Sequence, residues 1–285
     1  ETLEGLTLPR RGEKAFAGAL YAKRFARTPE QHLLSIVVLD AGISAQALPI
    51  LLSLPKQVTV AFSPYTADTA GRIATLRRAG YESWGMLPAM TTHYPQDDPG
   101  PLGLVGSLPK DELMRRLRVV MAETIGSAGM VLPLTEALSS KRTLYTDILT
   151  EIDARGLYLL AANPETTPEL RADEKKRSDK MRRAHQVIEY TGDDAAFAAS
   201  LAALMESLKT NDEVTVITSA NPENLLQWKR WLTVEPLEEP VVLAPLSAHW
   251  LPKEPAPLPE AADDGHGGGH GGGEKKDAKK SSGGH

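Results

Sequence analysis

Short apolar runs rich in β-branched residues alternate with helical segments from residue 33 to residue 247. Alternation of this kind predicts consecutive parallel βα units. Several runs are apolar at every position, as expected of strands that are covered on both faces. The runs that predict strands are residues 33–39, 57–63, 81–87, 129–134, 156–161, 186–190, 213–218 and 241–246.

The segments between these runs carry helix signals. Residues 109–125 and 194–208 each place apolar side chains on one face at spacings of three and four. Gly80 follows the helical segment 66–79 as a C-terminal glycine would, and Asn221-Pro222 is typical of an N-cap and first helical residue. Eight strands with helices between them fit one (β/α) barrel of about 220 residues. A doubly wound open sheet is the alternative.

Three parts are expected along the chain. Residues 1–30 form an N-terminal arm, residues 31–250 the barrel, and residues 251–285 a tail that is first Pro-rich and then rich in Gly, His and Lys. Nine of the 23 glycines fall between Gly265 and Gly284. Glycine at this density loses much backbone entropy on ordering, and apolar residues that could compensate are missing there. We therefore expect the tail to be disordered.

Composition excludes several classes of protein. The chain has no cysteine, which rules out disulfides, zinc–thiolate sites and cysteine nucleophiles. Its 37 acidic and 32 basic side chains give a net charge of −5, which argues against general nucleic-acid binding. No stretch approaches 18 consecutive apolar residues, so no membrane span is expected in this chain.

Five segments in this order carry a family resemblance: SIVVLDAGIS (35–44), VTVAFSPY (58–65), YPQDDPGPLGL (94–104), RGLYLLAANPETTP (155–168) and VVLAPLS (241–247). Together they resemble the divergent polysaccharide deacetylase family. The resemblance implies a single-domain, deformed (β/α) barrel of the NodB type, spanning roughly residues 8–250. It also implies amide or ester hydrolysis assisted by a divalent cation that Asp and His hold, and a periplasmic location.

Most positions that hold the cation in that family are changed here. Its Asp-Asp pair after the first strand corresponds to Asp40-Ala41, which leaves one carboxylate. Pro133 stands where the fourth strand usually carries a His. The ends of the third, fifth and seventh strands present Met86, Ala161 and Ala220. A catalytic zinc site needs three protein ligands, so we expect no metal and no cofactor in the barrel.

Five residues at strand ends remain as site candidates. Asp40 is the candidate catalytic base or ligand if activity is retained. Tyr65 and Tyr94 are candidates for stacking on sugars, and Asn163 and Asn221 for hydrogen bonds to sugar hydroxyls. Asn221 is equally well explained as a helix N-cap.

The tail offers a separate set of imidazoles. His266 and His270 lie four residues apart, and His285 ends the sequence. Flexible imidazoles at this spacing can bind a divalent transition metal weakly.

Three hypotheses follow. The first is a catalytically inactive, pseudoenzyme-like protein of the cell envelope that binds carbohydrate or a protein partner through the barrel mouth. The second is a metal-dependent polysaccharide deacetylase with altered ligands. The third is a metal-binding protein that acts through its His-rich tail. Whether the chain is an enzyme stays open here, with the missing ligands favouring the first hypothesis.

Overall fold

The computed structural model describes residues 2–3, 5–12, 16–165, 171–172, 175–176, 179–235 and 237–252. Residues 1–255 form one compact unit. The expectations for the tail, including its disorder and its three histidines, lie outside the described residues.

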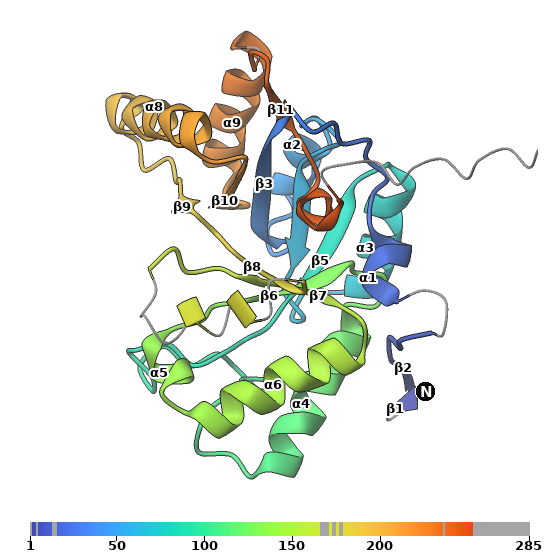
Figure 1. The fold of residues 1–285 in the computed structure, drawn as a ribbon. Coiled ribbons are helices and arrows are strands. Elements are labelled where there is room, and N and C mark those ends of the chain that lie inside the picture. Colours follow the sequence, from blue (N-terminus) through green and yellow to red (C-terminus); the bar gives the residue numbers. More distant parts are fainter. Residues whose placement is uncertain are drawn as a thin grey trace, which may run out of the picture. The chain divides into compact units, whose positions relative to one another are not determined.

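Nine parallel strands of the described chain form one sheet, in the order β8-β7-β6-β5-β4-β3-β10-β9, with β11 also paired to β3 (Figure 1). The strands are β3 (His32–Ala41), β4 (Thr59–Phe62), β5 (Glu82–Met86), β6 (Gly129–Leu132), β7 (Tyr158–Ala161), β8 (Met181–Arg183), β9 (Gln186–Val187), β10 (Glu213–Ser219) and β11 (Val241–Leu243).

One extended segment joins the two edges of this sheet. Its first part, β8, pairs with β7, and its second part, β9, pairs with β10. Between them, the amide of Ala184 donates to the carbonyl of Ala161 at 2.9 Å and the amide of His185 donates to the carbonyl of Thr215 at 2.7 Å. The sheet therefore curls into a deformed barrel, which confirms the predicted fold class.

Helices cover the outside of the barrel on two sides (Figure 1). The α4 and α6 helices pack against one group of strands, and α2, α3, α8 and α9 pack against the other. Their bounds are α2 (Ala47–Leu51), α3 (Thr69–Arg78), α4 (Lys110–Glu123), α5 (Glu136–Ser139), α6 (Arg142–Ala154), α8 (Asp194–Thr210) and α9 (Pro222–Val234).

Three sequence predictions of local structure are confirmed. The predicted helices at 109–125 and 194–208 correspond to α4 and α8. Gly80 adopts a positive φ of 91° directly after α3, a conformation that glycine reaches without strain. Asn221 caps α9, since its side chain accepts a hydrogen bond from the amide of Glu223 at 2.9 Å, and Pro222 is the first helical residue.

Three aromatic side chains pack together with aliphatic ones in the interior of the barrel. Trp84 lies 5.9 Å from Trp250 between ring centroids, and Trp250 stacks on Tyr158 at 4.5 Å. Trp250 ends the short 3-10 helix η1 (Leu246–Trp250), which lies after β11. A Cβ at Gly129 would lie only 2.4 Å from the Trp84 ring, so this packing requires glycine there. Trp84 is fully buried, and it therefore offers no sugar-binding surface.

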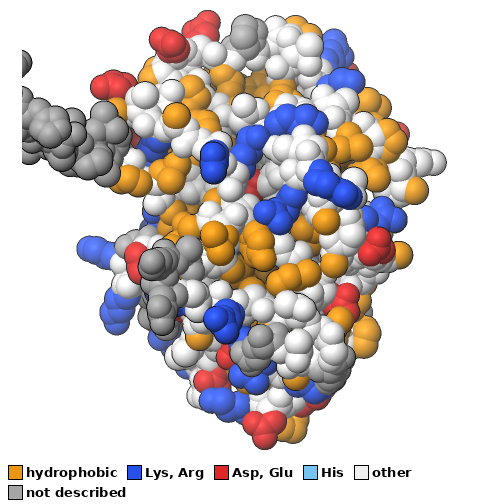
Figure 2. All heavy atoms as spheres, turned by 90° about the vertical axis from the view of Figure 1, so that its right-hand side faces the viewer, with side chains coloured by type: hydrophobic (Ala, Val, Ile, Leu, Met, Phe, Trp, Pro, Cys, Tyr) orange, Lys and Arg blue, Asp and Glu red, His pale blue; other side chains and the backbone are white. Residues whose placement is uncertain are grey.

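The N-terminal segment packs on the barrel through a few buried side chains. It contains β1 (Thr2–Leu3), which pairs antiparallel with β2 (Leu6–Thr7), and α1 (Ala17–Tyr21). Leu8 and Ala17 are buried. Figure 2 shows the face that includes this segment, where Lys and Arg side chains gather in the middle among apolar ones.

Candidate functional site

Asp40 lies near the C-terminal end of β3, within an irregularity of the sheet. The pairing of β3 with β4 shifts register between Val38 and Ala41, as at a β-bulge. Asp40 accordingly has a positive φ of 56°, which is uncommon for a residue other than glycine. Bulges re-aim side chains next to functional sites, and here the Asp40 carboxylate lines a pocket.

This pocket, which we call the mouth pocket, has a volume of about 350 Å³ and lies where β3, β4, β5 and β6 end. Its walls are mainly apolar and prolyl, with three carboxylates among them. Burial raises the pKa of Asp40. The lining residues are Asp40, Ile43, Ser63, Pro64, Tyr65, Met86, Leu87, Pro88, Ala89, Thr91, Asp97, Asp98, Pro99 and Pro133.

Tyr65 is fixed at the rim of the mouth pocket. Its hydroxyl donates to the carbonyl of Pro99 at 2.7 Å and accepts from the amide of Leu102 at 3.0 Å. Gly100, with a φ of 86°, packs so closely that a Cβ there would lie 2.9 Å from the Tyr65 hydroxyl. Tyr65 is still 45% exposed, so a side chain with a fixed orientation is open to solvent at the rim.

Asp97 and Asp98 hold the loop that forms one wall of the pocket. Asp98 accepts a hydrogen bond from the amide of Gly100 at 2.9 Å. Asp97 accepts from the hydroxyl of Thr91 at 3.3 Å and lies 3.5 Å from Nδ1 of His93. Both carboxylates therefore have partners within their own loop, as expected of acidic residues in turns.

Glu189 is a further carboxylate at this end of the barrel, and the sequence analysis missed it. It follows β9 and accepts hydrogen bonds from the amide and the hydroxyl of Ser219, at 2.6 and 2.7 Å. Ser219 pairs in register with Leu39, the residue before Asp40. Burial raises the pKa of Glu189, and the charge of Asp40 raises it further. No signal in the sequence pointed to it, because Glu189 falls inside the predicted strand 186–190, whereas β9 ends at Val187.

The family resemblance implies a divalent cation here, and the residues present do not fit one. Met86 and Pro133 line the mouth pocket together with Asp40, and neither is a ligand for a hard or borderline cation. Ala161 and Ala220 are buried. Within the part of the chain that the structure describes, no three His, Asp or Glu residues come together in a group that could hold a metal ion.

The other predicted sugar-binding residues do not meet at this pocket. Tyr94 is half-buried in the loop before Pro95 and is not part of the pocket lining. Asn163 lines a separate, open hollow of about 490 Å³ beside β9 and α8, together with Val187 and Ser200. Asn221 serves as the cap of α9. Of the predicted residues, the structure brings together Asp40 and Tyr65.

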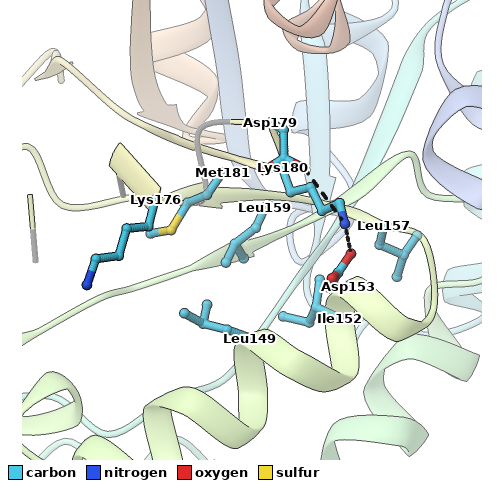
Figure 3. Close-up of a pocket in the computed structure, with 9 residues that line it drawn as sticks. All are labelled: Leu149, Ile152, Asp153, Leu157, Leu159, Lys176, Asp179, Lys180 and Met181. Carbon is cyan, nitrogen blue, oxygen red and sulfur yellow. Dashed lines mark ion pairs between the residues drawn. The ribbon is translucent and has the colours of Figure 1, made fainter. Parts of the chain in front are cut away.

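A further pocket of about 380 Å³ lies between α6 and strands β7 and β8, away from the mouth (Figure 3). Its floor is apolar, with Leu149 and Leu159 among its residues. Lys180 and Asp153 form an ion pair at 2.5 Å beside it. This pocket is on the helix-covered side of the sheet, so the strand ends of the barrel do not contribute to it.

The model of the family described as divergent polysaccharide deacetylase matches residues 36–250. Among solved structures, an uncharacterized protein from Agrobacterium tumefaciens C58 is 21% identical with a TM-score of 0.77, covering 85% of this chain and 99% of that one, and it shares the fold. The catalytic domain of a peptidoglycan N-acetylglucosamine deacetylase from Eubacterium rectale ATCC 33656 is 13% identical with a TM-score of 0.39, covering 78% of this chain and 96% of that one. No curated protein matches. The match over residues 36–250 covers most of the sequence, and the chain therefore belongs to the divergent polysaccharide deacetylase family.

Proposed function

We propose that this polysaccharide deacetylase-like protein is catalytically inactive and binds a glycan chain at the mouth pocket. The observation that carries the proposal is the identity of the residues that line the pocket beside Asp40. Met86 and Pro133 share its pocket at positions where the family resemblance implies ligands. Asp97 and Asp98 also line the pocket, but they accept hydrogen bonds within their own loop, and the described residues include no group of three that could hold a metal ion. Asp40 with thioether and prolyl neighbours cannot replace the water that a divalent cation loses on binding.

The same pocket has the properties of a carbohydrate site. Its volume of about 350 Å³ is enough for a small ligand. Tyr65 offers an exposed ring whose orientation is fixed by two hydrogen bonds, and a fixed aromatic face binds a sugar ring with little loss of side-chain entropy. Binding also tolerates looser geometry than catalysis does.

We place the protein in the cell envelope, in the periplasm, because its family is associated with extracellular and envelope polysaccharides. No described helix is both long and apolar enough to cross a membrane.

Two assays on one preparation test the proposal. Acetate release from N-acetylated oligosaccharides is measured with and without added divalent cation, and binding of the same oligosaccharides is measured by calorimetry. We expect binding that Tyr65→Ala weakens, without release of acetate. Metal-dependent release of acetate that Asp40→Ala abolishes would overturn catalytic inactivity. A lack of binding both of these oligosaccharides and of their de-N-acetylated forms would overturn the role in glycan recognition.

A further inference from the structure

We infer that the mouth pocket selects sugars with a free, protonated amino group over N-acetylated sugars, and that the Asp40 carboxylate accepts the ammonium. This inference rests on the proposed function and names the class of glycan. Its ligand is a de-N-acetylated amino sugar, the product of the reaction for which the family is named.

The first step of the argument is that the carboxylate of Asp40 is unused. Its backbone amide donates to the sulfur of Met86 at 3.1 Å. Its side-chain oxygens, by contrast, have no hydrogen bond or ion pair with any other described residue. Asp97 and Asp98 already accept hydrogen bonds within their loop, so Asp40 is the lining carboxylate with no partner among the described residues.

The second step concerns charge. Lys, Arg and His are missing from the described lining of the pocket, whereas three carboxylates belong to it. Glu189 adds a fourth carboxylate nearby, close enough for the charge of Asp40 to act on it. A hollow lined by charges of one sign concentrates ions of the opposite sign. The pocket therefore favours a cationic ligand over a neutral or anionic one.

The third step separates an ammonium from a metal ion. A divalent cation requires several anionic or imidazole ligands at fixed distances. Asp40, Asp97 and Asp98 all line the pocket, but no three carboxylates or imidazoles of the described residues come together in a group that could hold a metal ion. An ammonium needs only oxygen acceptors, and one charge-assisted hydrogen bond to a carboxylate is a strong contact. An acetamide in the same place is neutral. Its N–H can still donate to Asp40, but that hydrogen bond lacks the positive charge of an ammonium and is weaker.

The test compares two oligosaccharides of equal length, the β-1,4-linked tetramers of glucosamine and of N-acetylglucosamine. Calorimetric titration of the full chain at pH 6.5 should give about tenfold tighter binding of the glucosamine tetramer. The free energy of one hydrogen bond to a charged group corresponds to at least a tenfold change in Kd. The preference should shrink as salt is raised, because exposed charge interactions are screened.

Asp40→Asn keeps the shape of the side chain and tolerates the left-handed backbone, because Asn visits that region readily. It should remove the preference. Asp68→Asn is the matched control: Asp68 also has a positive φ, 53°, and the change in net charge is the same, but Asp68 is not among the residues of the pocket. This variant should keep the preference. Circular dichroism verifies that both variants fold, and the comparison of tetramers in the wild type stands without them.

The outcomes separate the two proposals. Equal or tighter binding of the N-acetylated tetramer would overturn amine selection while leaving glycan binding in place. Binding of neither tetramer would overturn both. A preference that survives in Asp40→Asn would overturn the assignment to Asp40.

Discussion

Glu189 accepts hydrogen bonds from both the amide and the hydroxyl of Ser219, and these bonds fasten the chain after β9 to the end of β10. The next strand beyond β10 is β3, which carries Asp40. Two carboxylates thus flank one serine at the ends of neighbouring strands. Because parallel strands end at the same edge, side chains distant in sequence meet there.

The charge of Asp40 should be measurable at Glu189. Burial and Asp40 both raise the pKa of Glu189, while the hydrogen bonds from Ser219 lower it. Asp40→Asn should therefore lower the pKa of Glu189, and Ser219→Ala should raise it. Carbon-detected NMR titration of the Glu189 carboxyl group gives both values. A Glu189 titration that is the same in Asp40→Asn and the wild type would mean that the two groups do not interact.

Another carboxylate, that of Glu82, is fully buried near the end of the barrel opposite to the mouth pocket. It accepts hydrogen bonds from the amide and hydroxyl of Ser247 and from Nε1 of Trp84. Ser247→Ala removes one donor from a buried carboxylate, which should lower the free energy of unfolding by about 1–3 kcal/mol. Denaturant unfolding measures this. Ser53→Ala, which removes an exposed hydroxyl bonded to the carbonyl of Ile50, should cost less than about 0.5 kcal/mol; equal losses would contradict the role given to Ser247.

The ion pair between Arg27 and Glu213 joins the N-terminal segment to β10. Nη1 of Arg27 lies 2.6 Å from Glu213, and the Arg27 side chain is 2% exposed. Arg27→Met should destabilise the protein by about 1.5–3 kcal/mol, since it removes a charge-assisted hydrogen bond. The Glu213 side chain is 22% exposed and keeps Arg182 at 3.7 Å, so its charge is not left unpaired. The exposed pair of Lys209 and Glu206 is a control, with both side chains 70% exposed; Lys209→Met should cost less than about 1 kcal/mol. Similar losses in the two variants would overturn this ranking.

Metal binding by the tail is a prediction from sequence alone. His266, His270 and His285 are the imidazoles expected to bind a divalent transition metal weakly. Elemental analysis of the protein with and without residues 265–285 should find metal only in the longer form. Metal retained by the shorter form would locate a site in the barrel. It would contradict the conclusion that the residues around Asp40 do not fit a divalent cation.

The sequence was sufficient to predict elements whose signals are local. The apolar runs located most strands of the sheet, and the spacing of apolar residues located α4 and α8. In the closing segment, the run 186–190 located β9, but β8 could not be predicted in the same way, because it is three residues long and two of them are arginine. Alternation of apolar and polar residues can indicate a strand only over a run longer than three residues.

Site residues were predictable only where their role depends on a strand end. Asp40 and Tyr65 were found for that reason. Glu189 was missed because it falls inside the predicted strand 186–190, and only the structure shows that β9 ends at Val187. The buried Glu82 was not predictable, because its partner Ser247 is 165 residues away and only the folded chain brings them together. Asn163 and Tyr94 also follow strands or turns, but the path of the loop after each strand, which is not encoded by periodicity, directs them away from the mouth pocket.

The last prediction concerns His249, which lies in η1 and is 2% exposed. Its Nε2 lies 2.9 Å from the hydroxyl of Ser35, and its Nδ1 lies 3.4 Å from the hydroxyl of Thr215. Burial lowers the pKa of His249 to about 3, and the positive charge of Arg182 acts in the same direction. The ring is therefore neutral in the folded protein at pH values where an unfolded histidine takes up a proton.

The sign follows from proton binding. Below about pH 6.5 the unfolded state binds a proton at this position and the folded state does not, so the free energy of unfolding falls as the pH is lowered toward the folded pKa. Between pH 7.5 and 5 the loss should be about 2 kcal/mol. His249→Gln retains an amide donor but cannot take up this proton. Its free energy of unfolding should therefore fall by about 2 kcal/mol less than that of the wild type between pH 7.5 and 5. His93→Gln, at an exposed position with a side chain 78% exposed, should follow the wild-type curve. Denaturant unfolding at pH 5, 6, 6.5 and 7.5 measures all three proteins, and parallel curves for wild type and His249→Gln would show that His249 binds a proton equally in the folded and unfolded states.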